Sequence, residues 1–123
     1  MDDKTQRRIL LVDDEANQRR AIGRVLMDLN ADIIESENGK AALETARTFR
    51  PDLVILDILM PEMDGFGFIE ALNEKKISIP LIYLTSDIQD TVKQRCLALG
   101  AKGFLNKPAQ ETQILGILKS VLG

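Results

Sequence analysis

The sequence predicts an α/β fold: a doubly wound, five-stranded parallel sheet flanked by five helices. Short, continuous apolar runs alternate along the chain with segments whose apolar residues recur every three or four positions. Continuous apolar runs are typical of strands that are buried on both faces of a parallel sheet. The helical segments between them provide the right-handed crossovers that parallel strands require. The alternation therefore predicts one sheet with helices on both of its faces.

The first strand and the first helix are each marked by a clear apolar pattern. The run ILLV at 9–12 predicts a strand. Four apolar residues then follow at positions i, i+3, i+4 and i+7: Ile22, Val25, Leu26 and Leu29. This spacing places them on one side of a helix, so the segment predicts a helix that packs one apolar stripe against the sheet.

The next elements are separated by residues that favour turns and caps. A weaker run at 33–34 (II) predicts the second strand, and 39–49 predicts a short helix. Asn38 precedes this helix as its N-cap, and Pro51 follows its end. The run LVIL at 53–56 predicts the third strand.

The second half of the chain repeats the pattern. A helix is predicted over 65–74, opened by a turn and cap at Asp64-Gly65, and strands are predicted at 81–84 (LIYL) and 103–105 (GFL). Gly100 marks the end of the fourth helix, and Pro108-Ala109 the start of the fifth. The apolar stripes of these two helices are Ile88, Val92, Cys96 and Leu99, and then Ile114, Ile117, Leu118, Val121 and Leu122.

The whole chain suits one domain spanning 1–123, with a core over about 8–122. Its net charge of −3 gives no support to direct nucleic acid binding, which requires a basic face. The sequence holds no apolar run of the ~20 residues that a membrane span needs. The N-terminal MDDKTQRR lacks the apolar segment of a secretory signal, and Cys96 is the single cysteine. These features predict a soluble, cytoplasmic protein without a disulfide framework.

The chain contains no histidine. This excludes histidine as a general base, histidine-containing zinc sites and nucleophiles activated by histidine. Any chemistry of this chain must therefore rest on other side chains.

A single domain of this pattern suits the flavodoxin-like strand order 2-1-3-4-5. In that order the first and third strands are neighbours, and their crossovers leave to opposite faces of the sheet. The crevice at their carboxyl ends is where ligands bind in such folds. The residues that follow each strand at this edge are therefore the candidate functional residues.

Charged and hydroxyl side chains follow four of the five predicted strands. Asp13-Asp14 follow the first strand, Asp57 the third, Thr85 the fourth and Lys107 the fifth. Carboxylates this close would raise one another's pKa unless a cation intervened. Hard oxygen ligands suit Mg²⁺, which binds one or two carboxylates together with phosphate oxygens. The set predicts phosphoryl chemistry, with Asp57 as the candidate nucleophile and Asp13-Asp14 as a metal-holding pair.

Five elements in this order carry a resemblance to a known family: Asp13-Asp14, Asp57, the MPEMDG that follows it, Thr85, and Lys107-Pro108. Over about residues 8–122 the chain resembles the receiver domain of two-component response regulators. The resemblance implies a single receiver domain in which Asp57 takes a phosphoryl group from a phosphohistidine. The donor would be a sensor histidine kinase or a phosphotransfer protein.

The resemblance also implies individual roles. Asp14, Asp57 and the backbone carbonyl of Leu59 would bind Mg²⁺ directly, and Asp13 would assist largely through water. Lys107 would pair with Asp57 and then with the phosphate, and the Lys107–Pro108 peptide bond is expected to be cis. For switching, the Thr85 hydroxyl would move to the phosphate, and Phe104 would turn inward with it.

The module implied in this way is a switch rather than an enzyme. Its only reactions would be its own phosphorylation and dephosphorylation. A downstream protein or output domain would recognise the face formed by the fourth helix, fifth strand and fifth helix. A homodimer could form on phosphorylation, and the chain could be a receiver excised from a longer regulator or hybrid kinase.

Two alternatives share the same fold. A Mg²⁺-dependent phosphohydrolase with an aspartyl-phosphate would carry a second aspartate two residues after the nucleophile, where this chain has Leu59. A flavin or nucleotide binder would need a phosphate-binding loop after the first strand, where acidic residues would instead repel a phosphate. Both are therefore less favoured than the switch.

Overall fold

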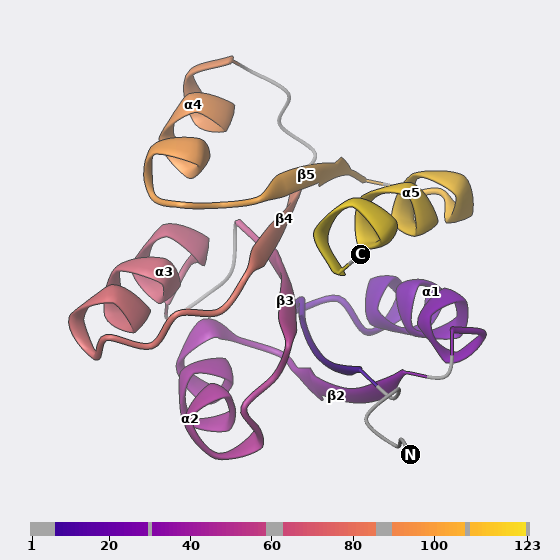
Figure 1. The fold of residues 1–123 in the computed structure, drawn as a ribbon, viewed down its shortest axis with the longest axis horizontal. Helices are drawn as coiled ribbons and strands as arrows, with labels where there is room; N and C mark the ends of the chain where they lie inside the picture. The colour runs from indigo at the N-terminus through magenta and orange to yellow at the C-terminus, as the bar shows by residue number, and fades with distance from the viewer. Residues whose placement is uncertain (1–6, 30, 59–62, 86–89, 108, 123) are drawn as a thin grey trace.

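The computed structural model of the chain describes residues 7–29, 31–58, 63–85, 90–107 and 109–122. Its centre is a parallel sheet with the strand order β2-β1-β3-β4-β5, which confirms the predicted topology (Figure 1). The five strands are β1 (Arg8–Val12), β2 (Asp32–Ser36), β3 (Leu53–Asp57), β4 (Leu81–Thr85) and β5 (Gly103–Asn106).

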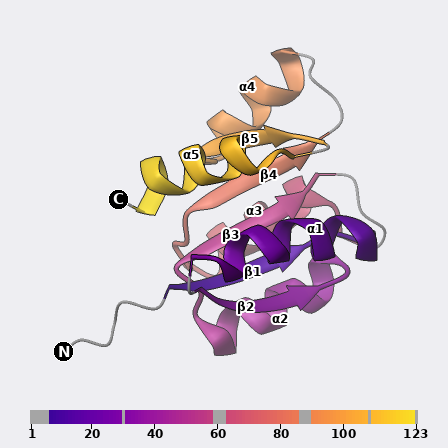
Figure 2. The same ribbon diagram turned by 90° about the vertical axis from the view of Figure 1, so that its right-hand side faces the viewer.

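Helices cover both faces of this sheet. They are α1 (Ala16–Met27), α2 (Gly39–Phe49), α3 (Gly65–Glu74), α4 (Asp90–Ala98) and α5 (Glu111–Leu122). Helices α1 and α5 lie on one face, and α2, α3 and α4 on the other (Figure 1). Figure 2 views the sheet from the side of α1 and α5, with all strands running in the same direction. Within the described residues, no helix is both long enough and apolar enough to cross a bilayer.

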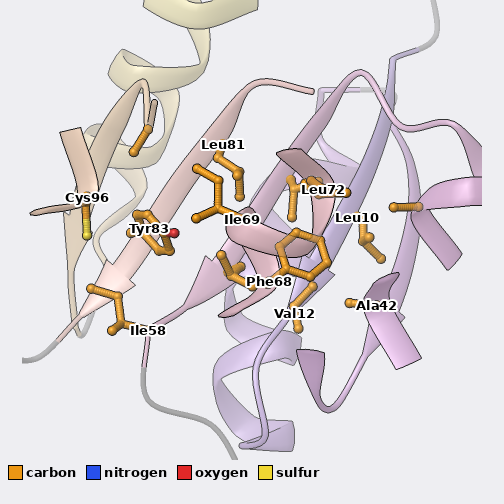
Figure 3. Close-up of a cluster of buried hydrophobic side chains, with 14 residues drawn as sticks. Leu10, Val12, Ala42, Ile58, Phe68, Ile69, Leu72, Leu81, Tyr83 and Cys96 are labelled. Atoms are coloured by element: carbon orange, nitrogen blue, oxygen red, sulfur yellow. The ribbon is translucent and has the colours of Figure 1, made fainter. Parts of the chain in front are cut away.

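The sheet separates two hydrophobic clusters. On β1, for example, Leu10 and Val12 point toward α2 and α3, whereas Ile9 and Leu11 point toward α1 and α5. Figure 3 shows the first of these clusters. All five residues of β3 are buried, because its neighbours β1 and β4 and the helices on both faces enclose it. Burial on both faces is the physical reason why the central strands read as continuous apolar runs.

Several predicted caps are confirmed. The Asn38 side chain accepts a hydrogen bond from the backbone N–H of Ala41 at 2.8 Å, at the start of α2. The Asp64 side chain accepts one from the N–H of Gly67 at 2.8 Å, at the start of α3. Gly100, predicted to stop the fourth helix, lies two residues beyond α4 with φ +105°. A positive φ of this size is readily adopted only by glycine.

Some predicted boundaries were wrong by a few residues. Leu29, predicted on the buried stripe of the first helix, lies beyond the end of α1 at Met27 and is 46% exposed. The β2 strand is longer than the predicted 33–34, because the polar residues Asp32, Glu35 and Ser36 extend it on both sides. Helix α5 begins at Glu111 rather than at Ala109. Pro108 and Ile88 lie outside the described residues.

Candidate functional site

The carboxyl edge of the sheet brings four acidic side chains together. Asp13 directly follows β1 and Asp57 ends β3, and these strands pair with Val12 opposite Leu56. Carboxylate oxygens of Asp13, Asp14, Glu15 and Asp57 all lie within 4.8 Å of one another. Asp13 is completely buried and Asp57 is 6% exposed, whereas Asp14 and Glu15 are exposed. The parallel topology therefore gathers the predicted Asp13, Asp14 and Asp57, and it adds Glu15, which was not predicted as a site residue.

Lys107 reaches into the same site from the end of β5. Its ammonium nitrogen Nζ lies 2.9 Å from Asp57 Oδ2, 2.9 Å from Asp13 Oδ2 and 3.1 Å from Glu15 Oε1. The Lys107 side chain is 11% exposed. The contacts to Asp57 and Glu15 are hydrogen bonds. The contact to Asp13 is an ion pair without hydrogen-bond geometry, and Asp13 Oδ2 accepts no hydrogen bond from the described residues.

Burial and the Lys107 ammonium act in opposite directions on the pKa of the buried Asp13. Burial raises the pKa of Asp13 above its ordinary value of 3.8, although the Glu15 amide and the Lys107 ammonium oppose that rise. Burial alone would lower the pKa of Lys107, but its contacts with Asp57, Asp13 and Glu15 outweigh burial and raise it. Four carboxylates face one ammonium, so a further cation would relieve their repulsion.

The residues present fit a hard divalent cation. Asp13 Oδ2 is a buried carboxylate oxygen with a free acceptor position, and the neighbouring oxygens lie at the spacing that a single ion can bridge. The donors are all oxygens, which suits Mg²⁺ rather than zinc or copper. The exposed Asp14 and Glu15 leave the cluster accessible to solvent.

Arg19 on α1 holds the backbone of the acidic segment in place. Its guanidinium donates to the backbone carbonyl of Asp13 and, at 2.9 Å, to the carboxylate of Glu35 at the end of β2. The Glu15 amide donates to Asp13 Oδ1 at 2.9 Å. Arg19 is not predictable as a site residue from the sequence, because its contact is to a main-chain oxygen that no residue pattern reveals.

The remaining predicted site residues are placed only in part. Thr85 is the last residue of β4, and its backbone is in register with Asn106, next to Lys107. Its side chain lies outside the described set. Phe104 on β5 is partly buried and packs against the cluster beneath α2, α3 and α4. Leu59 and the Lys107–Pro108 bond also fall outside the described residues.

The metal-free protein should lose stability with rising pH because of Asp13. In the unfolded chain Asp13 releases its proton near pH 3.8, whereas in the folded protein its pKa is raised. The free energy of unfolding due to Asp13 therefore falls as pH rises from 3.8 through the folded pKa. The raised pKa of Lys107 contributes stability that is fully present below pH 10.5. Lys107 therefore does not change how the free energy of unfolding depends on pH in the acidic range where Asp13 titrates.

Urea unfolding in EDTA at several pH values, with Asp13→Asn beside the wild type, measures this slope. We expect the variant to lose less stability than the wild type as the pH rises above 3.8 through the folded pKa of Asp13. Mg²⁺ at about 100 times its dissociation constant should add about 2.7 kcal/mol to the wild type and much less to the variant. Equal slopes for the two proteins would contradict the assignment to Asp13.

Gly65, the first residue of α3, packs directly against the backbone that leaves β3. Its N–H donates to the carbonyl of Ile58 at 2.8 Å. A Cβ at this position would lie 2.9 Å from Cα of Ile58 and 2.8 Å from the Tyr83 ring. We expect Gly65→Ala to lower the free energy of unfolding by about 1–3 kcal/mol, because the backbone must shift to admit the methyl group.

Chemical denaturation of Gly65→Ala beside Gly116→Ala tests this expectation. Gly116 lies on α5, and a Cβ there would meet no atom within 4 Å. Gly116→Ala should stabilise the protein by about 0.5–1 kcal/mol, since alanine favours a helix over glycine. A similar gain at Gly65 would show that the contact with Ile58 does not limit packing.

The comparisons with known proteins agree with this fold. A sequence model of the response regulator receiver domain matches residues 9–119. The chain is 36% identical over 117 residues to the probable transcriptional regulator ycf27 of Porphyridium aerugineum. It is 31% identical over 116 residues to the alkaline phosphatase synthesis transcriptional regulatory protein PhoP of Bacillus subtilis.

Each of these two alignments covers 94% of this chain but only 48% of the relative, so the chain spans about half the length of these curated relatives. Among solved structures, the chemotaxis response regulator CheY4 of Vibrio cholerae matches with a TM-score of 0.86 and 32% identity. That match covers 95% of this chain and 99% of the other.

Proposed function

Because this chain belongs to the response regulator receiver family of two-component signalling, we propose that it accepts a phosphoryl group on Asp57 in the presence of Mg²⁺. The observation that carries the proposal is the position of the Asp57 carboxylate. It lies at the end of a fully buried strand, 2.9 Å from the Lys107 ammonium and beside the acidic pair Asp13-Asp14. Burying a carboxylate at the end of an apolar strand is unfavourable unless its charge is compensated, and the site supplies that compensation.

In the proposed reaction a carboxylate oxygen of Asp57 attacks the phosphorus of a phosphohistidine. A P–O bond to Asp57 forms as the P–N bond breaks, and the bond's electron pair leaves with the imidazole of the donor. Asp13, Asp14, Asp57 and the backbone carbonyl of Leu59 would hold Mg²⁺. When bound, Mg²⁺ would offset the negative charge of the phosphoryl oxygens. The Lys107 ammonium donates a hydrogen bond to the Asp57 carboxylate. It would form an ion pair with the phosphoryl group after that group is attached to Asp57.

Phosphorylation would shift a two-state equilibrium through Thr85 and Phe104. Phe104 on β5 is opposite Tyr83 on β4, and Thr85 ends β4 opposite Asn106. The paired strands β4 and β5 would therefore connect the site to the face formed by α4, β5 and α5. The face formed by α4, β5 and α5 would then bind a downstream protein or output domain. A second copy of the chain would bind the same face if the protein forms a homodimer on phosphorylation.

We also propose the extent of the domain, its location in the cell and its phosphoryl donor. Residues 8–122 would form a single receiver domain that acts in the cytoplasm, with a sensor histidine kinase or phosphotransfer protein as the phosphoryl donor. The output would lie in a separate protein, or in a further domain that occupies the part of the longer relatives that this chain does not span. The chain itself would bind neither nucleic acid nor membrane and would turn over no outside substrate.

The test is the intact mass of the protein after incubation with acetyl phosphate, with Mg²⁺ or with EDTA. We expect one added phosphoryl group with Mg²⁺ and none with EDTA. The absence of an adduct under both conditions would contradict the proposed function. Rapid release of phosphate from unrelated phosphomonoesters would instead support the phosphohydrolase.

A further inference from the structure

Arg19 is a mostly buried arginine of α1 whose guanidinium contacts two other parts of the chain. Only 16% of its side chain is exposed, although α1 lies on the outside of the sheet (Figure 2). The guanidinium donates to the main-chain carbonyl of Asp13 and, at 2.9 Å, to the carboxylate of Glu35. Arg20, the next residue, is exposed and donates to Asn17 within the same helix. Burying a charged side chain is unfavourable unless its hydrogen bonds are made, so these two contacts determine where the Arg19 guanidinium lies.

The acidic turn, residues 13–15, is attached to its neighbours through its main chain. On one side the Asp13 N–H donates to the carbonyl of Ser36, the last residue of β2, at 3.2 Å. On the other side the Arg19 N–H donates to the Glu15 carbonyl at 3.1 Å. The Arg19 guanidinium adds a bond to the Asp13 carbonyl and a second one to the end of β2. Arg19 therefore joins α1, the acidic turn and β2 at one point.

Three of the four clustered carboxylates belong to the acidic turn: those of Asp13, Asp14 and Glu15. Oxygen atoms of these side chains lie within 4.8 Å of one another, so their charges repel and favour a turn that opens. A turn that is already held closed has met this cost before a cation arrives. Ligands that are positioned in advance bind a metal more tightly than ligands that must be ordered on binding.

We infer that Arg19 is a positioning residue that strengthens Mg²⁺ binding by holding the acidic turn closed. The inference rests on the proposed function, in which Asp13 and Asp14 hold the metal. Arg19 acts through the turn, because its guanidinium donates to the main chain of Asp13 and to Glu35 at the end of β2. A positive charge near the cluster would by itself repel Mg²⁺, so removing the charge alone would tighten binding. Loss of positioning weakens binding instead, and the direction of the change distinguishes the two roles.

The test is Arg19→Gln in the 123-residue chain. Mg²⁺ affinity is measured from the amide signals of Asp14 and Glu15 in ¹H–¹⁵N NMR spectra during titration with Mg²⁺ alone. Loss of a group that orients metal ligands typically weakens binding 10- to 100-fold, so we expect the lower end, about tenfold, for a contact to the main chain. The Mg²⁺ concentration that gives half the maximal phosphorylation rate with acetyl phosphate should rise by the same factor. The rate at saturating Mg²⁺ should stay within about twofold of wild type.

Arg20→Gln is the matched control, because it removes the same charge from the next position of α1. Its only described side-chain hydrogen bond is to Asn17 of the same helix, so Mg²⁺ affinity should stay within about twofold of wild type. A second variant, Arg19→Lys, keeps the charge but replaces the planar guanidinium by a single nitrogen atom. It should also weaken Mg²⁺ binding, by about threefold or more, since one ammonium does not reproduce the geometry of the guanidinium contacts.

The outcomes distinguish the inference from the proposed function. Weaker Mg²⁺ binding by both Arg19 variants, with wild-type binding by Arg20→Gln, supports the inference. Wild-type or tighter Mg²⁺ binding by either Arg19 variant overturns the inference and leaves the proposed function intact, as does an equal loss of affinity in Arg20→Gln. Mg²⁺ binding without a phosphoryl adduct on the wild type overturns the proposed function alone, and a wild type that binds no Mg²⁺ overturns both.

Discussion

Asp57→Asn should remove phosphorylation altogether: in Mg²⁺ and acetyl phosphate, the variant is expected to keep its unmodified mass. The amide that replaces the carboxylate carries no negative charge and is a poor nucleophile toward phosphorus. Loss of a nucleophile typically lowers a rate by several orders of magnitude, so we expect the initial rate to fall by at least about 1,000-fold. The change removes one carboxylate from a crowded acidic cluster, so the fold should persist.

The control for this experiment is Asp52→Asn, just before the opposite end of the same strand. Asp52 is exposed, and its carboxylate accepts a hydrogen bond from the Arg8 N–H at 2.8 Å. This variant should gain the phosphoryl group at the wild-type rate. Circular dichroism of both variants checks that the fold is retained. An adduct on Asp57→Asn at the wild-type rate would mean that another residue is the acceptor.

Lys107→Ala should have the largest effect on stability in the absence of Mg²⁺. The substitution leaves Asp13 and Asp57 buried without the ammonium that lies 2.9 Å from each of them. Removing one partner of a buried charge pair costs about 3–5 kcal/mol. We expect about 3 kcal/mol here, the lower end, because the Lys107 side chain keeps some solvent contact. Urea unfolding in EDTA measures this difference.

Two further variants test whether the loss of stability in Lys107→Ala comes from the buried ion pair. Lys102 is an exposed lysine just before β5, and Lys102→Ala should change stability by less than about 0.5 kcal/mol. In the double variant Asp13→Asn with Lys107→Ala, the loss due to Lys107 should be smaller than in the wild-type background, because one buried charge has gone. If the two single effects simply added, the buried ion pair would not be the cause.

Much of the fold could be predicted from the sequence, because burial determines the pattern of the central strands. The runs at 9–12 and 53–56 are continuous in the sequence, and β1 and β3 are indeed enclosed on both faces. The edge strand β2 is predicted only at 33–34, since its other three residues, Asp32, Glu35 and Ser36, are polar. Leu29 continues the helical spacing but lies past the end of α1, because periodicity does not show where a helix stops.

The candidate site could be predicted in outline and not in detail. That Asp13, Asp57 and Lys107 meet follows from parallel strands whose carboxyl ends share one edge. The contacts of Arg19 and Tyr83 could not be predicted, because both side chains donate to main-chain carbonyls, Arg19 to that of Asp13 six residues before it and Tyr83 to that of Gly65. Such contacts depend on how far a side chain reaches in the folded protein, which no spacing along the chain records.

The buried Asp13 oxygen that accepts no hydrogen bond from the described residues has a consequence for laboratory evolution. A library of this protein sorted only for heat resistance in metal-free buffer should enrich substitutions such as Asp13→Asn, which remove a desolvated charge. Natural sequences often keep such locally unfavourable groups where activity needs them. Thermal selection without magnesium would therefore yield more stable proteins that have lost part of the acidic cluster at the carboxyl edge of the sheet.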